Sequence, residues 1–200
     1  MGCDWLACSD RMRAFRAAGA VTDSRCCPIF VYGSSMNSSA TRESSRGAKF
    51  LATAYLPDNE LCFPRWDEDR RTFIVGYQRV AGKHLWGVIW LIPERERSSL
   101  DSAKGCKPGQ SGHRYERVPI TVRLSDGSTA AVETYRAVPG QSGQPSKAHL
   151  ELIIAGAEEH KLPRHYIDDL RRIVTMNVQC PLPPAVGDPP DCAVAVLADQ

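Results

Sequence analysis

The feature of this sequence best suited to chemistry is an apolar strand that runs into a turn of small residues. Apolar residues followed by Gly and Ser are typical of a buried strand that ends in a tight loop. Backbone N–H groups in such a loop have little side-chain cover, and groups of this kind bind carboxylates and oxyanions. We therefore predict an anion site here, and the alternative is a strand end with a convenient turn. The segment is Ile29, Phe30, Val31, Tyr32, Gly33, Ser34 and Ser35.

Lys104 is a second candidate, at the expected end of a helix. Pro93 predicts the start of this helix and Gly105 its end, so Lys104 is the last helical residue. The helix dipole favours a cation there by about 0.3–1 kcal/mol, which is a purely structural reason for the lysine. The other interpretation is an active role, which requires that burial lower the lysine pKa from its reference value of about 10.4.

The residues that follow Lys104 add a thiol and positive charge. Cys106 lies close in sequence to Lys104 and Lys107, and nearby cations lower the pKa of a thiol. A buried, inert cysteine is the alternative. Lys107, His113 and Arg114 make the next loop basic. These side chains either lie in solvent or, at the mouth of a pocket, favour an acidic ligand.

The elements that must position these residues are mostly short strands. β-Branched and aromatic residues between turn residues predict strands, and Ser125 to Ser128 read as a hairpin turn. Ser146 is a candidate N-cap for one helix, and Pro163 begins another. Together these patterns predict an α+β fold, a small, mostly antiparallel β-barrel with flanking helices. The expected strands after the first are residues 49–55, 60–63, 72–77, 85–91, 115–124 and 129–135.

Composition sets the class of protein. With 200 residues the chain has enough length to bury one core, and we place the domain at residues 28–176, between an N-terminal extension (1–27) and a Pro-rich C-terminal tail (177–200). A net charge of +2 gives no case for nucleic acid or anionic membranes. No apolar run reaches membrane-spanning length, and the N-terminus does not read as a secretory signal. The eight cysteines lack metal-binding spacing. We expect a cytoplasmic protein without a metal.

Six segments, in order along the chain, resemble the γ-glutamylcyclotransferase family. The resemblance spans roughly residues 29 to 174, and its strength lies in the order of segments that are individually weak. The segments are Phe30-Val31-Tyr32-Gly33-Ser34, Ala54-Tyr55-Leu56 with Leu61-Cys62-Phe63, Leu85-Trp86-Gly87-Val88-Ile89-Trp90, Leu100-Asp101-Ser102-Ala103-Lys104-Gly105, Tyr115-Glu116-Arg117-Val118, and Pro145-Ser146 with Ile153-Ile154-Ala155-Gly156-Ala157 and Leu162-Pro163.

This resemblance implies a β-barrel with a cavity at the loop, and a reaction without a cofactor. In the family, the loop holds a γ-glutamyl group and a Glu takes a proton from its α-ammonium. The freed amine attacks the γ-carbonyl, which releases 5-oxoproline and an amine. The implied partner is a small γ-glutamyl compound, bound along residues 29–35. His149 falls where the family carries a substrate-side Tyr. Tyr135 either points its hydroxyl into the cavity or is a core tyrosine.

Two positions depart from the family pattern. Ser35 replaces an Asn, which is a mild change, and Lys104 replaces the catalytic Glu. A protonated lysine cannot accept a proton without strong desolvation. The leading hypothesis is therefore a γ-glutamylcyclotransferase-family enzyme, impaired if Lys104 cannot replace Glu. One alternative is a non-catalytic protein that binds a small carboxylate. Another is an enzyme that uses Lys104 or Cys106 as a nucleophile. The carboxylates nearest in sequence that could act as the base instead are Glu133, Glu116 and Asp101.

Overall fold

Five strands close into a barrel in the order β1-β3-β2-β4-β5. The computed structural model describes residues 26–106 and 113–176. All neighbouring strands in the barrel pair antiparallel except β1 and β5, which pair in parallel through Ile29 with Glu133 and Phe30 with Thr134. The expected barrel with flanking helices is confirmed. The strands are β1 (Cys26–Val31), β2 (Lys49–Asp67), β3 (Thr72–Pro93), β4 (Tyr115–Leu124) and β5 (Thr129–Ala137).

A long hairpin of β2 and β3 forms most of the barrel wall. Each strand joins two of the shorter strands expected from the sequence, because the pairing continues through irregular positions. The register shifts between Pro57 and Asn59 and again between Cys62 and Arg65. Proline cannot donate to a strand ladder, and a bulge lets a strand bend without ending. The breaks in the sequence pattern are therefore bends in two continuous strands.

Side-chain and glycine caps set the ends of the helices that flank the barrel. The Ser146 hydroxyl accepts a hydrogen bond from the N–H of His149, and Gly105 ends α3 with a left-handed φ of 62°. Both ends agree with the sequence prediction. The Asn37 side chain caps a short helix that the sequence patterns did not predict, α2. The helices are α2 (Ser38–Ser44), α3 (Arg97–Lys104), α4 (Lys147–Glu159) and α5 (Arg164–Arg171), with 3-10 turns η1 (Ser34–Met36) and η2 (Glu94–Glu96).

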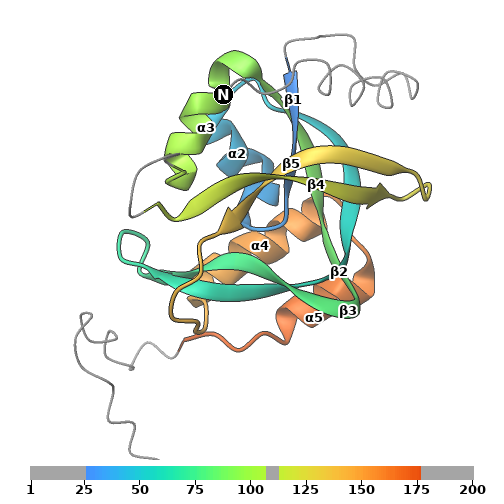
Figure 1. Cartoon of the computed structure of the whole chain (residues 1–200). Coiled ribbons are helices and arrows are strands. Elements are labelled where there is room, and N and C mark those ends of the chain that lie inside the picture. The colour runs from blue at the N-terminus through green and yellow to red at the C-terminus, as the bar shows by residue number, and fades with distance from the viewer. Residues whose placement is uncertain (1–25, 107–112, 177–200) are drawn as a thin grey trace, which may run out of the picture.

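The helices lie around the end of β1, where the candidate loop begins. In Figure 1, α3 and α2 lie on the same side of the molecule, α4 crosses the middle of the view below β1, and α5 lies at the lower right. Gly156 of α4 packs directly on η1, since a Cβ there would lie 2.6 Å from the backbone nitrogen of Asn37. A glycine at this position allows α4 to hold the loop in place.

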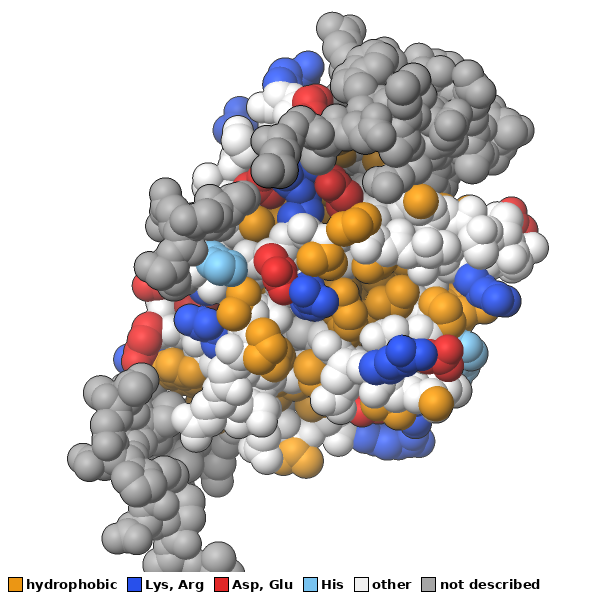
Figure 2. Space-filling view, in the orientation of Figure 1, with side chains coloured by type: hydrophobic (Ala, Val, Ile, Leu, Met, Phe, Trp, Pro, Cys, Tyr) orange, Lys and Arg blue, Asp and Glu red, His pale blue; other side chains and the backbone are white. Residues whose placement is uncertain are grey.

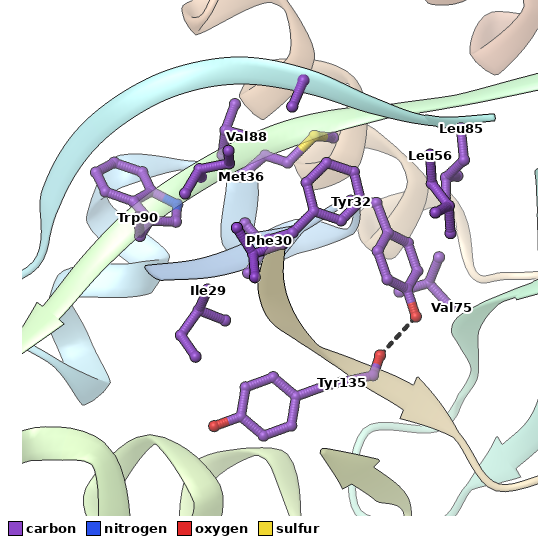
Figure 3. Close-up of a cluster of buried hydrophobic side chains, with 14 of the residues drawn as sticks. Ile29, Phe30, Tyr32, Met36, Leu56, Val75, Leu85, Val88, Trp90 and Tyr135 are labelled. Carbon is purple, nitrogen blue, oxygen red and sulfur yellow. Dashed lines mark hydrogen bonds between the residues drawn. The ribbon is translucent and has the colours of Figure 1, made fainter. Parts of the chain in front are cut away.

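The core fills the barrel and continues beneath the helices. Phe30, Met36 and Trp90 are among its largest buried side chains, and Figure 3 shows them together with Tyr32. On the outer face shown in Figure 2, hydrophobic side chains gather near the centre and charged ones lie around them. Because the candidate loop directly follows Phe30 and contains Tyr32, it is anchored on these tightly packed side chains.

The first strand extends beyond the expected start of the domain. Cys26 and Cys27 belong to β1 and pair with Pro93 and Ile92 of β3, so the extension ends before residue 26. The rest of the expected extension and the expected tail lie outside the described residues. Within the described ranges, no helix is long and apolar enough to cross a membrane, and no group of His, Cys, Asp and Glu is suited to a metal ion.

Candidate functional site

The loop that follows β1 has backbone N–H groups without partners in the described part of the chain, whereas its carbonyl groups accept hydrogen bonds. The carbonyl oxygen of Gly33 accepts from Met36 N at 2.8 Å, and that of Ser34 accepts from Asn37 N at 3.1 Å. The Ser35 carbonyl accepts from the Trp90 indole at 3.1 Å and from the Thr41 hydroxyl at 2.6 Å. Among the hydrogen bonds of the described residues, none uses the N–H of Gly33, Ser34 or Ser35 as donor. Unpartnered N–H groups in a loop of this kind can bind an oxyanion or a carboxylate.

Close packing against the barrel holds the loop in this conformation. The Tyr32 hydroxyl donates to the carbonyl oxygen of Tyr135 on β5 at 2.7 Å, the dashed bond in Figure 3. Burial raises the pKa of Tyr32 well above its usual value, so the hydroxyl keeps its proton. A Cβ on Gly33 would lie 2.4 Å from Cγ1 of Val75, so position 33 accepts only glycine without rearrangement.

Lys104 is the last residue of α3, as the sequence predicted, and its amine reaches the loop. The Nζ atom donates to the Ser35 hydroxyl. Burial, with a smaller contribution from the positive charge of Arg70, lowers the pKa of Lys104 to about 7. This effect exceeds the 0.3–1 kcal/mol that a helix end provides, because one pKa unit corresponds to about 1.4 kcal/mol. A lowered pKa is what the active interpretation of Lys104 requires.

Two hollows adjoin at Ser35 and Lys104, which line both of them. A cavity of about 20 Å³ lies inside the barrel beside Tyr32 and Tyr135. A groove of about 640 Å³ lies outside it, between α2, α3, α4 and the turn that joins β2 to β3. The inner cavity has space for about one water molecule. A ligand with several carbon atoms therefore lies mostly in the groove or displaces side chains of the cavity.

The Tyr135 hydroxyl does not point freely into the cavity. It donates to Asp101 Oδ1 at 2.6 Å, and Arg117 donates to both oxygens of the same carboxylate at 2.8 and 2.6 Å. Burial and this hydrogen bond raise the pKa of Tyr135. The ring lines the cavity, whereas the hydroxyl ties α3, and with it Lys104, to the barrel.

The carboxylates that the sequence offered as substitute bases are held in ion pairs. Glu133 pairs with Arg97, and Glu116 lies 2.7 Å from Arg136. Asp101 carries the bonds just described. None of the three lines the cavity or the groove. This arrangement leaves Lys104 as the titratable side chain at the junction of the two hollows.

The structure also places three other candidates. Ile29 is fully buried and lines neither hollow, whereas Phe30 and Val31 line the cavity. Cys106 is buried and burial raises the pKa of its thiol, which agrees with the alternative of a buried, inert cysteine. Arg114 pairs with Asp67 and Asp69 instead of facing the groove. Lys107 lies outside the described residues.

His149 lies in the groove wall, although its place in the first turn of α4 also suited an exposed residue. It is only 8% exposed, and its Nε2 has no hydrogen-bond partner among the described residues. Burial, together with Arg70 and Lys104, lowers the pKa of His149 to about 4, so the ring is neutral near pH 7. Arg70, from the turn between β2 and β3, is the site residue that sequence reasoning missed. A charged residue in a polar turn gives no signal of its own.

The chain is similar in sequence to known proteins. Residues 84–170 match the AIG2-like family. The chain is 28% identical to the γ-glutamylcyclotransferase of Bos taurus over 148 residues, and 27% identical to that of Homo sapiens. Each alignment covers 72% of this chain and 77% of the relative.

Solved structures share the fold. A structure described as γ-glutamyl cyclotransferase superposes with a TM-score of 0.71 at 24% identity, covering 79% of this chain and 94% of the other. A human structure described as uncharacterized protein loc79017 superposes with a TM-score of 0.72, also at 24% identity, and covers 80% and 95% of the two chains. At this identity the structural likeness supports the barrel and its helices alone.

Proposed function

Because this chain belongs to the γ-glutamylcyclotransferase-like family, we propose that it converts γ-glutamyl compounds to 5-oxoproline and a free amine, with Lys104 as the base. The observation that carries the proposal is the Lys104 amine, whose pKa is about 7, beside loop 32–35. A neutral lysine can accept a proton, whereas an ordinary lysine at this pH cannot.

The proton transfers balance with no further reactant. Neutral Lys104 takes a proton from the substrate's α-ammonium and becomes an ammonium ion. The free amine attacks the γ-carbonyl carbon, and backbone N–H groups of Gly33, Ser34 or Ser35 stabilise the negative charge that forms on its oxygen. Lys104 then returns this proton to the departing nitrogen as the carbon–nitrogen bond breaks. The attacking nitrogen still carries one proton more than the ring amide of 5-oxoproline, and Lys104 passes that second proton to the released amine, which leaves as an ammonium ion while Lys104 is neutral again. Attacker and target belong to one molecule, so binding the folded substrate contributes much of the rate.

The Lys104 amine, in place of the family's carboxylate, should weaken substrate binding more than it slows proton transfer. A carboxylate attracts the substrate's ammonium group, whereas Lys104 offers no opposite charge and Arg70 repels it. A lysine with a pKa near 7 is, however, a stronger base than a carboxylate. We therefore expect weak binding of cationic substrates together with competent proton transfer, which a high KM and an ordinary kcat would reveal.

The test is 5-oxoproline release from a panel of γ-glutamyl amines and γ-glutamyl peptides. Wild type is compared with Lys104→Arg, which keeps a long cationic side chain but cannot lose its proton near neutral pH. The proposal expects turnover by the wild type and a loss of at least about 100-fold in Lys104→Arg, the usual contribution of a general base. Equal turnover of the two proteins would show that Lys104 is not the base.

A non-catalytic carboxylate-binding protein is the second candidate. The free N–H groups of the loop and the cations Lys104 and Arg70 favour it. Binding of glutamate or 5-oxoproline, with no 5-oxoproline released from any compound of the panel, would favour this function over the first. For either function we propose a cytoplasmic location, which agrees with the free thiols of Cys27, Cys62 and Cys106.

A further inference from the structure

The groove beside Lys104 carries positive charge that the neighbouring Asp67, which pairs with Arg70 and raises the pKa of His149, offsets only in part. Arg70 and Lys104 line it, and the only carboxylate among the described residues of its wall is that of Glu43, an exposed side chain on α2. Arg70 lowers the pKa of both Lys104 and His149, and Lys104 lowers that of His149. The three groups are therefore close enough to repel positive charge on one another. A negatively charged group in the groove relieves this repulsion.

Arg70 keeps donors available on the groove side. Its Nη2 donates to the carbonyl oxygen of Ala103 at 3.1 Å, and its Nε lies 3.7 Å from Asp67 Oδ2. These two contacts hold the guanidinium between the β2–β3 turn and the end of α3. No described residue accepts from Nη1. Because a guanidinium has five N–H donors in a planar fork, an oriented Arg70 can still bind an oxyanion.

His149 supplies a second, independent observation. The residue is 8% exposed and lines the groove, and its buried Nε2 makes no hydrogen bond with the described residues. Buried polar atoms nearly always have a partner, and one that lacks it loses free energy on folding. The torsion that turns an imidazole ring is soft, so a ligand in the groove can bring a ring nitrogen into a hydrogen bond. A neutral imidazole carries one N–H donor for this purpose.

We propose that this groove binds an oxyanion, the carboxylate or phosphoryl group of a small ligand, between the Arg70 guanidinium and the His149 imidazole. Two sources provide such a group. One is the carboxylate of a leaving amino acid, which rests on the proposed function because only a γ-glutamyl compound seated at loop 32–35 carries its leaving group into the groove. The other is a separate phosphate ion or phosphate ester, which does not depend on turnover.

The experiment measures binding, so it does not depend on catalysis. Glutarylalanine is γ-glutamylalanine without the α-amino group, and it cannot cyclise. Glutarylalaninamide has the same shape but lacks the leaving-group carboxylate, and inorganic phosphate is the third probe. Each is titrated calorimetrically into the full-length wild type and into Arg70→Gln, Arg71→Gln and His149→Phe. Arg71 is the matched control, since it lies in the same turn and is exposed but does not line the groove.

We expect glutarylalanine to bind wild type at least about tenfold more tightly than its amide, as a charge-assisted hydrogen bond allows. Arg70→Gln should remove this preference, His149→Phe should reduce it several-fold, and Arg71→Gln should keep it. Phosphate binding that depends on Arg70, with no preference between the two glutaryl compounds, would assign the groove to a separate phosphoryl ligand and also support the proposal. Equal binding of the two glutaryl compounds together with no phosphate binding would overturn it, as would equal affinities of Arg70→Gln and Arg71→Gln. Failure of 5-oxoproline release alone would overturn the proposed function and leave this result intact.

Discussion

Lys104→Met should stabilise the protein, and the gain should depend on pH. The pKa of Lys104 falls from 10.5 to about 7 because the folded protein buries its amine. At about 1.4 kcal/mol for each pKa unit, this difference corresponds to roughly 5 kcal/mol of unfolding free energy lost at low pH. Met fills a similar space without a charge. It also loses the hydrogen bond to Ser35, worth about 1 kcal/mol, and the interaction with the helix end, worth about 0.3–1 kcal/mol. A net gain of about 2–4 kcal/mol remains.

The direction of the pH dependence follows from which state holds the proton. Between pH 7 and 10.5 the unfolded chain keeps a proton on Lys104 and the folded protein does not, so the stability of the wild type rises with pH in this window. Below pH 7 both states are protonated, and the full cost is present. The advantage of Lys104→Met is therefore largest at pH 6 and shrinks steadily towards pH 10.

Urea unfolding of the two proteins, followed by circular dichroism from pH 6 to pH 9.5, measures this difference. Other groups that titrate in the range are common to both proteins and cancel. A Lys104→Met protein that is less stable than wild type at pH 6, or a difference that stays constant with pH, would refute the idea that folding desolvates the lysine.

Three further variants test the site. Gly33→Ala should lose about 1–3 kcal/mol in thermal unfolding, because its Cβ would lie 2.4 Å from Val75, and a combined Val75→Ala change should remove most of that coupling; additive effects would contradict the packing. Tyr135→Phe should lose about 1.5–3 kcal/mol with its hydrogen bond to Asp101, and its kcat should fall as α3 loosens; unchanged stability and kcat would contradict that role. Lys104→Glu should lower KM for γ-glutamyl compounds, because a carboxylate attracts the substrate ammonium, and it should lose about 1 kcal/mol of stability at the helix end. An unchanged KM would contradict the idea that the positive charge of the site weakens substrate binding.

The parts of the fold that local patterns predict are those that local chemistry controls. The Ser146 cap and the Gly105 helix end each depend on one residue and its neighbours, and both agree with the structure. The parallel pairing of β1 with β5 joins Ile29 to Glu133 across a long stretch of sequence, and no local pattern reports it. Helix α2 escaped the sequence analysis because its seven residues have too few turns to show a period.

In the candidate site, too, local sequence patterns predict some features, whereas others depend on contacts between distant elements. Its loop and its lysine can be read from the sequence, because a Gly-Ser turn after a strand and a residue before a terminal Gly are local patterns. The protonation state of Lys104 cannot be read in this way, because its pKa depends on burial and on Arg70, and distant elements provide both. His149 illustrates the same point: its position was known, but its burial depends on how α4 packs against the rest of the fold.

The most direct test of the central claim, that Lys104 is the base, is the pH dependence of kcat/KM for 5-oxoproline release by the wild type between pH 5.5 and 8.5. If neutral Lys104 accepts the proton, kcat/KM rises with pH and reaches half its limiting value near pH 7, the pKa of the lysine in the folded protein. A carboxylate base would instead place this rise near pH 4 to 5. A kcat/KM that is already at its limit at pH 5.5 would contradict the account.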